Sequence, residues 1–283
     1  MRTVLGRGSA TGAALAAVAV ALSLTTTVLA TPTTINDVDL TAGGGAVFDP
    51  EHETYGCVFD EDTRYYSPIG DGSIGIRTDG FDGALVLWVG DNAFTDADGV
   101  GNLVGQQLTV GPTKVSGVKV TRIERALPGS RTLRSLIKLT NPSKKILRRS
   151  ITLDTNLGSD GSTALELSSS GDIRFDSRDR WGITSEQPGS DPVVTMVNYG
   201  KGRVVRPQFQ IGPVAGDECI LTSFRITLGP KQTRYMMFFV ELSEDDLDAA
   251  SSARKFNRKR LSSALLAGLG SEVRQRILDW DLT

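Results

Sequence analysis

Histidine is almost missing from this sequence, which contains His52 and no other. A hydrolase that pairs serine or cysteine with a histidine base would have to use this residue, which lies in the loop-like stretch DPEHETYG. No GxSxG elbow accompanies it, and we interpret His52 as structural. The sequence also lacks a GxxxxGK[ST] loop, an HExxH pair and a GxGxxG that connects a strand to a helix. The commonest nucleotide, zinc and histidine-dependent sites are therefore excluded.

Cysteine is nearly as scarce, since the chain has only Cys57 and Cys219. No CxxC occurs, which excludes a thiolate metal site and a dithiol redox motif. In an exported protein, an even number of cysteines predicts a disulfide, here between an early and a late strand. Two buried free thiols are the alternative.

Acidic residues are absent from residues 1–30, which contain two arginines and then an apolar run over about residues 13–24. The run ends in Val28-Leu29-Ala30, with small residues where signal peptidase requires them. This pattern predicts a secretory signal peptide cleaved after Ala30. An uncleaved membrane anchor is disfavoured because a spanning helix needs about 20 apolar residues. We therefore expect a secreted protein, extracellular or at the cell surface, without a membrane span after cleavage.

Charged residues are unevenly distributed, although the formal net charge of the whole chain is only −2. Residues 31–100 contain fourteen Asp and Glu against two Arg, a net of −12. Residues 101–150 contain eleven Lys and Arg against one Glu, a net of +10. We expect the two blocks to neutralise each other across neighbouring strands, which argues against a nucleic-acid partner. The rival hypothesis is that the acids cluster alone and hold a cation.

Short apolar runs bounded by Gly, Pro, Asp and Asn dominate residues 46–242. In LRSLIKL (133–139) and CILTSFRITL (219–228), apolar and polar residues alternate, as is typical of half-buried antiparallel strands. ALVLWV (84–89) and YMMFFVEL (235–242) are apolar on both faces, so we expect them in central positions. Such strands without intervening helical periods predict a mainly β fold, a large antiparallel β-sandwich.

The sequence changes to a helical period after residue 242. Ser243 and Asp246 have the spacing of a capping box, and Ser271 can cap again. One face of the final helix would carry Val273, Ile277 and Trp280. We therefore predict two or three C-terminal α-helices packed on the sandwich. The basic run RKFNRKR (254–260) is interpreted as a solvated helix face. The domain plan is residues 1–30 signal peptide, 31–242 β-sandwich and 243–283 helical segment.

The stretch NLGSDGSTALELSSSGDIRFDSRDRW (156–181) is rich in Asp, Ser and Gly between strand-like segments. Its aspartates can fix turns through hydrogen bonds. Carboxylates beside an aromatic ring also suit a polyol, whose hydroxyls donate hydrogen bonds and whose carbons stack on the ring. The candidate ligand-binding residues are Asp154, Asn156, Asp160, Asp172, Asp179 and Trp181. A glycosidase needs only two carboxylates, but the sequence does not show which converge, so we assign no catalytic residue.

A second acidic stretch, DNAFTDADG (91–99), provides the candidate metal ligands Asp91, Asp96 and Asp98. Neither this stretch nor DTNLGSDG (154–161) has the spacing of an EF-hand loop. We expect these aspartates to form turns, with an irregular calcium site as the alternative. The expectation is therefore no cofactor, with calcium as the one candidate.

Several short motifs follow one another in an order that resembles an uncharacterised domain of secreted bacterial proteins. They are TNP (140–142), LGSD (157–160), SSGD (169–172), DRW (179–181) and DP (191–192), followed by GLGSEVRQRILDW (268–280), which resembles the closing helix of that domain. The resemblance covers residues 65–282. It implies a β-sandwich and no catalytic residue, because the domain has no assigned activity. The strand pattern is also similar to galactose-mutarotase sandwiches, but those usually rely on histidines that this chain lacks.

Three functions agree with these observations. The leading hypothesis is a secreted, non-catalytic β-sandwich that binds a glycan or another extracellular polymer. The first alternative is a carboxylate-dependent carbohydrate-active enzyme, and the second is a structural surface or interaction protein. The lack of a catalytic signature favours a protein that is not an enzyme. The sequence leaves the oligomeric state open.

Overall fold

The structure is a computed structural model that describes residues 30–54, 57, 65–96, 98–186, 189–202, 205–213 and 218–282. The predicted signal peptide lies outside the described residues, apart from Ala30. No helix in these ranges is long and apolar enough to cross a membrane.

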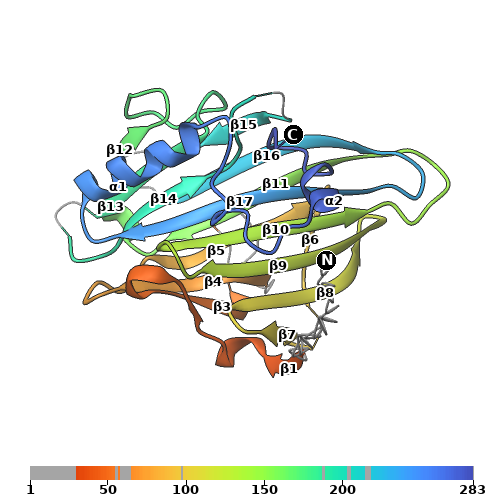
Figure 1. Ribbon diagram of the computed structural model, residues 1–283, viewed down its shortest axis with the longest axis horizontal. Coiled ribbons are helices and arrows are strands. Elements are labelled where there is room, and N and C mark those ends of the chain that lie inside the picture. The colour runs from red at the N-terminus through yellow and green to blue at the C-terminus, as the bar shows by residue number, and fades with distance from the viewer. Residues whose placement is uncertain are drawn as a thin grey trace, which may run out of the picture.

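Two antiparallel sheets pack face to face, which confirms the predicted β-sandwich (Figure 1). The nine strands of sheet I are, in spatial order, β1 (Thr31–Thr34), β7 (Val100–Val104), β8 (Gln107–Val115), β9 (Val118–Leu127), β10 (Thr132–Thr140), β17 (Thr233–Ser243), β14 (Val193–Val197), β13 (Trp181–Glu186) and β12 (Thr163–Ser168). Sheet II has the order β15 (Pro207–Ile211), β16 (Cys219–Leu228), β11 (Leu147–Leu157), β5 (Phe81–Val89), β4 (Tyr65–Ile74), β3 (Ala46–Thr54) and β2 (Leu40–Thr41), with β6 (Asn92–Ala93) paired to β5.

The alternation of apolar residues determines which side of each strand faces the main core. In β10, Leu133, Ile137 and Leu139 point between the sheets, as their spacing predicts. The run YMMFFVEL (235–242), which is apolar on both faces, lies in β17. Its predicted central position is confirmed, because β17 lies between β10 and β14. Met236 and Phe238 face the core between the sheets, whereas Met237 and Phe239 face the opposite side.

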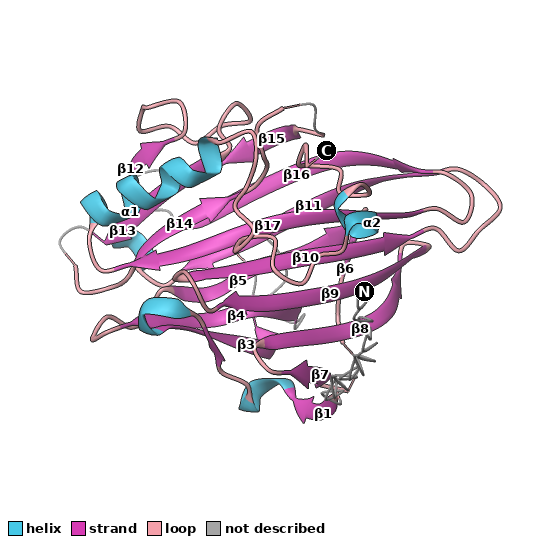
Figure 2. Ribbon diagram, viewed as in Figure 1, coloured by secondary structure: helices cyan, strands magenta, loops and turns pink. Residues whose placement is uncertain are grey.

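A second apolar core lies on the outer side of sheet I, under the C-terminal segment. From the sheet it contains Met237 and Phe239 of β17, and the segment contributes Phe256, Leu265 and Trp280 among others. The helices of this segment are confined to the outer side of sheet I (Figure 2). The part of sheet I that contains β10, β17, β14 and β13 is therefore covered on both faces.

The C-terminal helices are shorter than the sequence predicts, and their caps differ. The two α-helices are α1 (Asp246–Ala253) and α2 (Ser271–Arg274), with four 3₁₀ turns elsewhere, η1 (Ile35–Asp37), η2 (Gly43–Gly45), η3 (Asp160–Ser162) and η4 (Arg254–Asn257). The predicted cap at Ser243 is wrong, because Ser243 ends β17 and the side chain of Asp245 caps α1. The predicted cap at Ser271 is wrong as well, because Ser271 begins α2 and Gly270 precedes it without a side-chain cap.

The final helix also ends earlier than its apolar spacing predicts. Ile277 and Trp280 lie beyond α2 in an extended tail, where Ile277 forms a parallel bridge to Tyr235 of β17. Both side chains still face the second core. The spacing of Ile277 and Trp280 in the sequence therefore indicates that both contact sheet I, and it does not indicate a helix.

The disulfide between Cys57 and Cys219 is confirmed. The two Cα atoms lie 5.7 Å apart, and 162 residues separate them in the chain. The bond links the segment before β4 to the first residue of β16, so it joins early and late parts of sheet II.

The expected neutralisation between the two charge blocks is not found. Among the described residues, no ion pair joins an acid of residues 31–100 to a Lys or Arg of residues 101–150. The main reason is topological, since β3, β4 and β5 lie in sheet II, whereas β8, β9 and β10 lie in sheet I. Arg148 and Arg149 of β11 are the exception, because they lie in sheet II and line one hollow with Asp91, without an ion pair to it among the described contacts. The acids of the first block lie instead beside one another.

Candidate functional site

An acidic cleft of about 630 Å³ lies where β3 pairs with β4 and where β5 begins. Eight of its lining residues are carboxylates or amides, and none of those described is Lys or Arg. They are Asn36, Asp49, Glu51, Glu53, Asp71, Asp79, Asp82 and Asn156. The cleft therefore has a wall of hydrogen-bond acceptors with negative charge.

Two glycines allow the segments around the acidic cleft to approach each other. A Cβ at Gly158 would lie 2.2 Å from the carbonyl oxygen of Asp79, so this contact admits no side chain. A Cβ at Gly70 would lie 2.6 Å from the Cβ of Glu51. Asp79 itself has a φ of 69°, in the left-handed region that Asp adopts more readily than most residues.

The crowding of carboxylates raises several pKa values in the acidic cleft. Burial, the charges of Asp39 and Asp71 and a hydrogen bond with Asp39 raise the pKa of Asp49 to about 6. Partial burial and the charge of Asp82, with smaller contributions from other acids, raise the pKa of Asp79 to about 6. The pKa of Asp82 is also raised, first by burial and then by Asp160. Among the described residues, only burial and other acids act on these three pKa values, and both favour the protonated carboxyl group.

Two acceptor atoms in the cleft have no hydrogen-bond partner among the described residues. They are Oδ1 of Asp49 and Oδ1 of Asn156, both buried. Buried polar atoms are normally satisfied, so each of these acceptors is suited to a donor from beyond the described residues, such as a ligand. Hydroxyl groups, ammonium groups and cations are the chemical classes that can supply this contact.

No metal centre is formed by protein ligands alone in the part of the chain that the structure describes. There, no three His, Cys, Asp or Glu side chains come together in an arrangement that could hold a metal ion. The candidate ligands Asp91, Asp96 and Asp98 do not form a common site. Two of them accept backbone hydrogen bonds, and the third is exposed. Asp96 accepts the N–H of Gly99, Asp98 accepts the N–H of Val100, and Asp91 is exposed.

His52, between the cleft residues Glu51 and Glu53, contacts Asp96. Its Nδ1 contacts Oδ1 of Asp96, and its backbone N–H donates to Asn36. The Asp96 carboxylate is almost completely buried, and this burial raises its pKa although His52 lowers it. The pair ties β3 to the loop before β7, which agrees with a structural role for His52.

The candidate ligand residues from the sequence separate into three places. Asn156 lines the acidic cleft, and Asp160 is near enough for its charge to raise the pKa of Asp82. Asp154 lies in β11 and is fully buried, so a ligand from solvent does not reach it. Asp172 and Asp179 lie in another loop, between β12 and β13.

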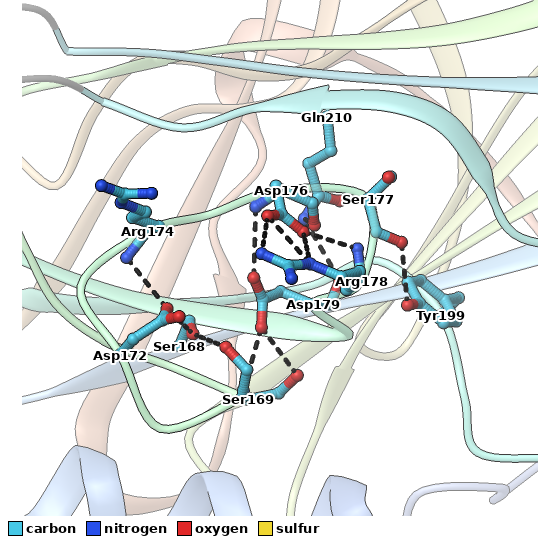
Figure 3. A network of polar contacts seen from close by, with 11 residues as sticks. Ser168, Ser169, Asp172, Arg174, Asp176, Ser177, Arg178, Asp179, Tyr199 and Gln210 are labelled. Carbon is cyan, nitrogen blue, oxygen red and sulfur yellow. Dashed lines mark hydrogen bonds and ion pairs between the residues drawn. The ribbon is translucent and has the colours of Figure 1, made fainter.

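That loop is held by the hydrogen bonds shown in Figure 3. Asp179 is buried and accepts the backbone N–H groups of Ser170 and Asp176. Asp172 is exposed and accepts the hydroxyl of Ser168 and the N–H of Arg174, which lower its pKa. These carboxylates therefore fix the turn, as aspartates in loops often do.

Trp181 offers no ring face to solvent. It is 3% exposed, packs in the second core and donates its indole N–H to Oδ1 of Asn257. The side chain anchors the C-terminal segment to β13 instead of stacking on a ligand.

Sequence reasoning overlooked the carboxylates that dominate the acidic cleft. Asp49, Asp79 and Asp82 all belong to the segment of residues 31–100, whose acidity is visible in the sequence. These carboxylates come together because β3, β4 and β5 pair with one another, and no short sequence motif predicts this pairing. The pairing also explains why Asn156, distant in the chain, joins them from β11.

No protein-family model matches the chain, and no curated protein matches it at a significant level. The resemblance to a domain of secreted bacterial proteins therefore stays a prediction, as does the likeness to galactose-mutarotase sandwiches.

Proposed function

We propose that this protein is a secreted, non-catalytic β-sandwich that binds a hydroxyl-rich ligand, a glycan, in the acidic cleft. The observation that carries the proposal is the cleft wall, which has six carboxylates, two amides and two orphan acceptors. Sugar hydroxyls are donors that such a wall can accept at several points at once. The Cys57–Cys219 disulfide supports an oxidising, extracellular location.

Calorimetric titration with neutral oligosaccharides tests the proposal. Asp82→Asn removes one charged acceptor from the cleft, and we expect about tenfold weaker binding, since hydrogen bonds to charged groups contribute about 1.5 to 3 kcal/mol. Asp91→Asn is the matched control, because Asp91 is an exposed acid that does not line the cleft. Equal affinities of the two variants, or no binding of any oligosaccharide, would contradict the proposal. Repeating the titration with a chelator tests whether calcium contributes.

A second candidate function is carboxylate-dependent hydrolysis of a glycan. It is favoured by the raised pKa values of Asp49 and Asp79, because a glycosidase needs one protonated and one ionised carboxyl group. Release of reducing ends from the bound oligosaccharide separates the two functions. An enzyme would lose turnover in Asp49→Asn or Asp79→Asn and keep binding, whereas a binding protein releases no product in any variant.

A further inference from the structure

A second cavity lies at an open edge of the sandwich, and its lining is mainly apolar, unlike that of the acidic cleft. It has a volume of about 590 Å³ and is lined by residues 163–165, 173–176 and 210–213, which we call the edge groove. β12 is the last strand of sheet I and β15 the last strand of sheet II, so each has one strand partner. The groove therefore opens between two sheet edges, and its size is typical of small-molecule sites.

Large apolar side chains are exposed at the rim of the edge groove. Ile173 is 73% exposed and Ile211 is 53% exposed, and Phe209 of β15 next to the groove is 45% exposed. Leu165 and Phe175 continue the apolar lining inward. Exposed apolar patches of this kind commonly mark binding surfaces.

The inner wall of the groove is rigid. Phe175 is 6% exposed and packs between two glycines, Gly182 of β13 and Gly212. A Cβ at Gly182 would lie 2.8 Å from the ring, and one at Gly212 would lie 2.5 Å from the Cβ of Phe175. Both positions therefore require glycine, and together they fix the Phe175 side chain as a preformed apolar surface.

Two polar side chains, those of Thr163 and Arg174, lie in the groove beside the apolar surface. Thr163 is 3% exposed, and its hydroxyl oxygen makes no hydrogen bond there. The guanidinium of Arg174 is exposed at the groove, and its charge contributes to the lowered pKa of the neighbouring Asp176. The one carboxylate in the lining, Asp176, is bound by Arg178, which lowers its pKa to about 2. A buried hydroxyl group and an exposed cation thus lie beside an apolar surface, which complements an anion with an apolar body.

We propose that the edge groove binds an unbranched amphipathic acid, with its hydrocarbon chain on Ile173, Phe175 and Ile211 and its carboxylate near Thr163 and Arg174. This second site is independent of the glycan-binding proposal, because it shares no lining residue with the acidic cleft.

Calorimetric titration of the full chain with decanoate, 1-decanol and decylammonium tests the proposal. Decanoate should bind most tightly, and shortening it to octanoate should weaken binding about fourfold for each methylene removed. Equal binding of decanoate and decylammonium would overturn the assignment of the charged head group. Absence of decanoate binding would overturn the site itself.

Three variants and one control variant locate the binding. Ile173→Asp with Ile211→Asp should abolish decanoate binding, whereas Ile146→Asp, at an isoleucine that is 56% exposed and outside the groove, should leave it unchanged. Arg174→Gln should weaken decanoate about fivefold and leave decanol unaffected. Thr163→Val should weaken decanoate while the free protein stays as stable or becomes more stable, because its hydroxyl lacks a partner there. Unchanged decanoate affinity in the double variant would place the ligand elsewhere.

Discussion

Asp279 is fully buried, and its two carboxylate oxygens accept the same backbone N–H, that of Met237 in β17. The indole N–H of Trp280 donates to the carbonyl of Met237. β14 pairs with β17 only as far as Phe239, so the edge of β17 beyond it would otherwise lack partners on that side. These two side chains, together with backbone bonds between Tyr235 and the tail, take the place of a strand.

Replacing Asp279 by alanine should lower the free energy of unfolding by about 1 to 3 kcal/mol, the cost of an unsatisfied buried donor. Asp279→Asn keeps an acceptor oxygen, so its free energy of unfolding should decrease less than that of the alanine variant. Urea denaturation of the two variants and the wild-type chain measures the difference. An alanine variant as stable as the wild type would show that the Met237 N–H finds another partner.

Asp49 makes stability depend on pH in a defined window. Its pKa is raised from 3.8 to about 6 in the fold, so its favourable contribution is complete below 3.8 and is lost as the pH rises to 6. Asp49→Asn should therefore be more stable than wild type at pH 7.5 and show no such gain at pH 3.5. Because the Asp49 side chain as a whole is only partly buried, we expect a gain of about 1 kcal/mol after discounting for solvent screening. Thermal melts at both pH values check the sign, with Asp91→Asn as the exposed control.

The strands were largely predictable from the sequence. Most of them pack one face against a core, so that apolar residues occupy every second position. In β16, Ile220, Phe224 and Ile226 face the main core as their spacing predicts. The C-terminal helices were less predictable. Their apolar residues follow the outer face of sheet I, and extended as well as helical segments contribute to the second core. The spacing of Val273, Ile277 and Trp280 therefore indicates burial but not secondary structure.

The C-terminal segment packs on sheet I through the apolar side chains of the second core, and Phe256 is one of the largest of them. It is fully buried, and its ring lies 5.3 Å from that of Phe239 of β17. Phe256→Ala should lower the free energy of unfolding by about 3 to 5 kcal/mol through lost burial and a residual cavity. Phe209→Ala, at an exposed position, should cost far less in the same denaturation experiment. Similar losses in both variants would mean that the second core repacks around the cavity.

The disulfide between Cys57 and Cys219 affects the stability of the whole molecule, because the two cysteines are 162 residues apart in the chain. In the chain-entropy model, closing a loop of this length stabilises the fold by about 4 to 5 kcal/mol, mainly by restricting the unfolded chain. Replacing Cys57 and Cys219 by serine should remove a stabilisation of this order. Urea titrations of the oxidised wild type, the reduced wild type and the double variant measure it. Reduced wild type and double variant should agree, and a reduced chain as stable as the oxidised one would contradict the expectation.

The charge of the whole molecule illustrates the limit of sequence reasoning. Two blocks of opposite charge are adjacent in the chain, yet β3, β4 and β5 pair among themselves in sheet II. The acids of the cleft therefore raise each other's pKa values instead of meeting the cations of β8, β9 and β10. Neighbours in sequence are not neighbours in a sandwich whose sheets are built from interleaved segments.

The position of β17 between β10 and β14 has a consequence for how the chain acquires its structure. One side of sheet I, from β1 to β10, and the other side, from β14 to β12, meet only through this strand. β17 pairs with β10 across about a hundred residues of intervening chain. Such distant pairings must form before the sheet is continuous, which makes folding slow, in the range of about milliseconds to seconds. Until then both halves expose unpaired strand edges, so the nascent protein passes through a period of high susceptibility to self-association.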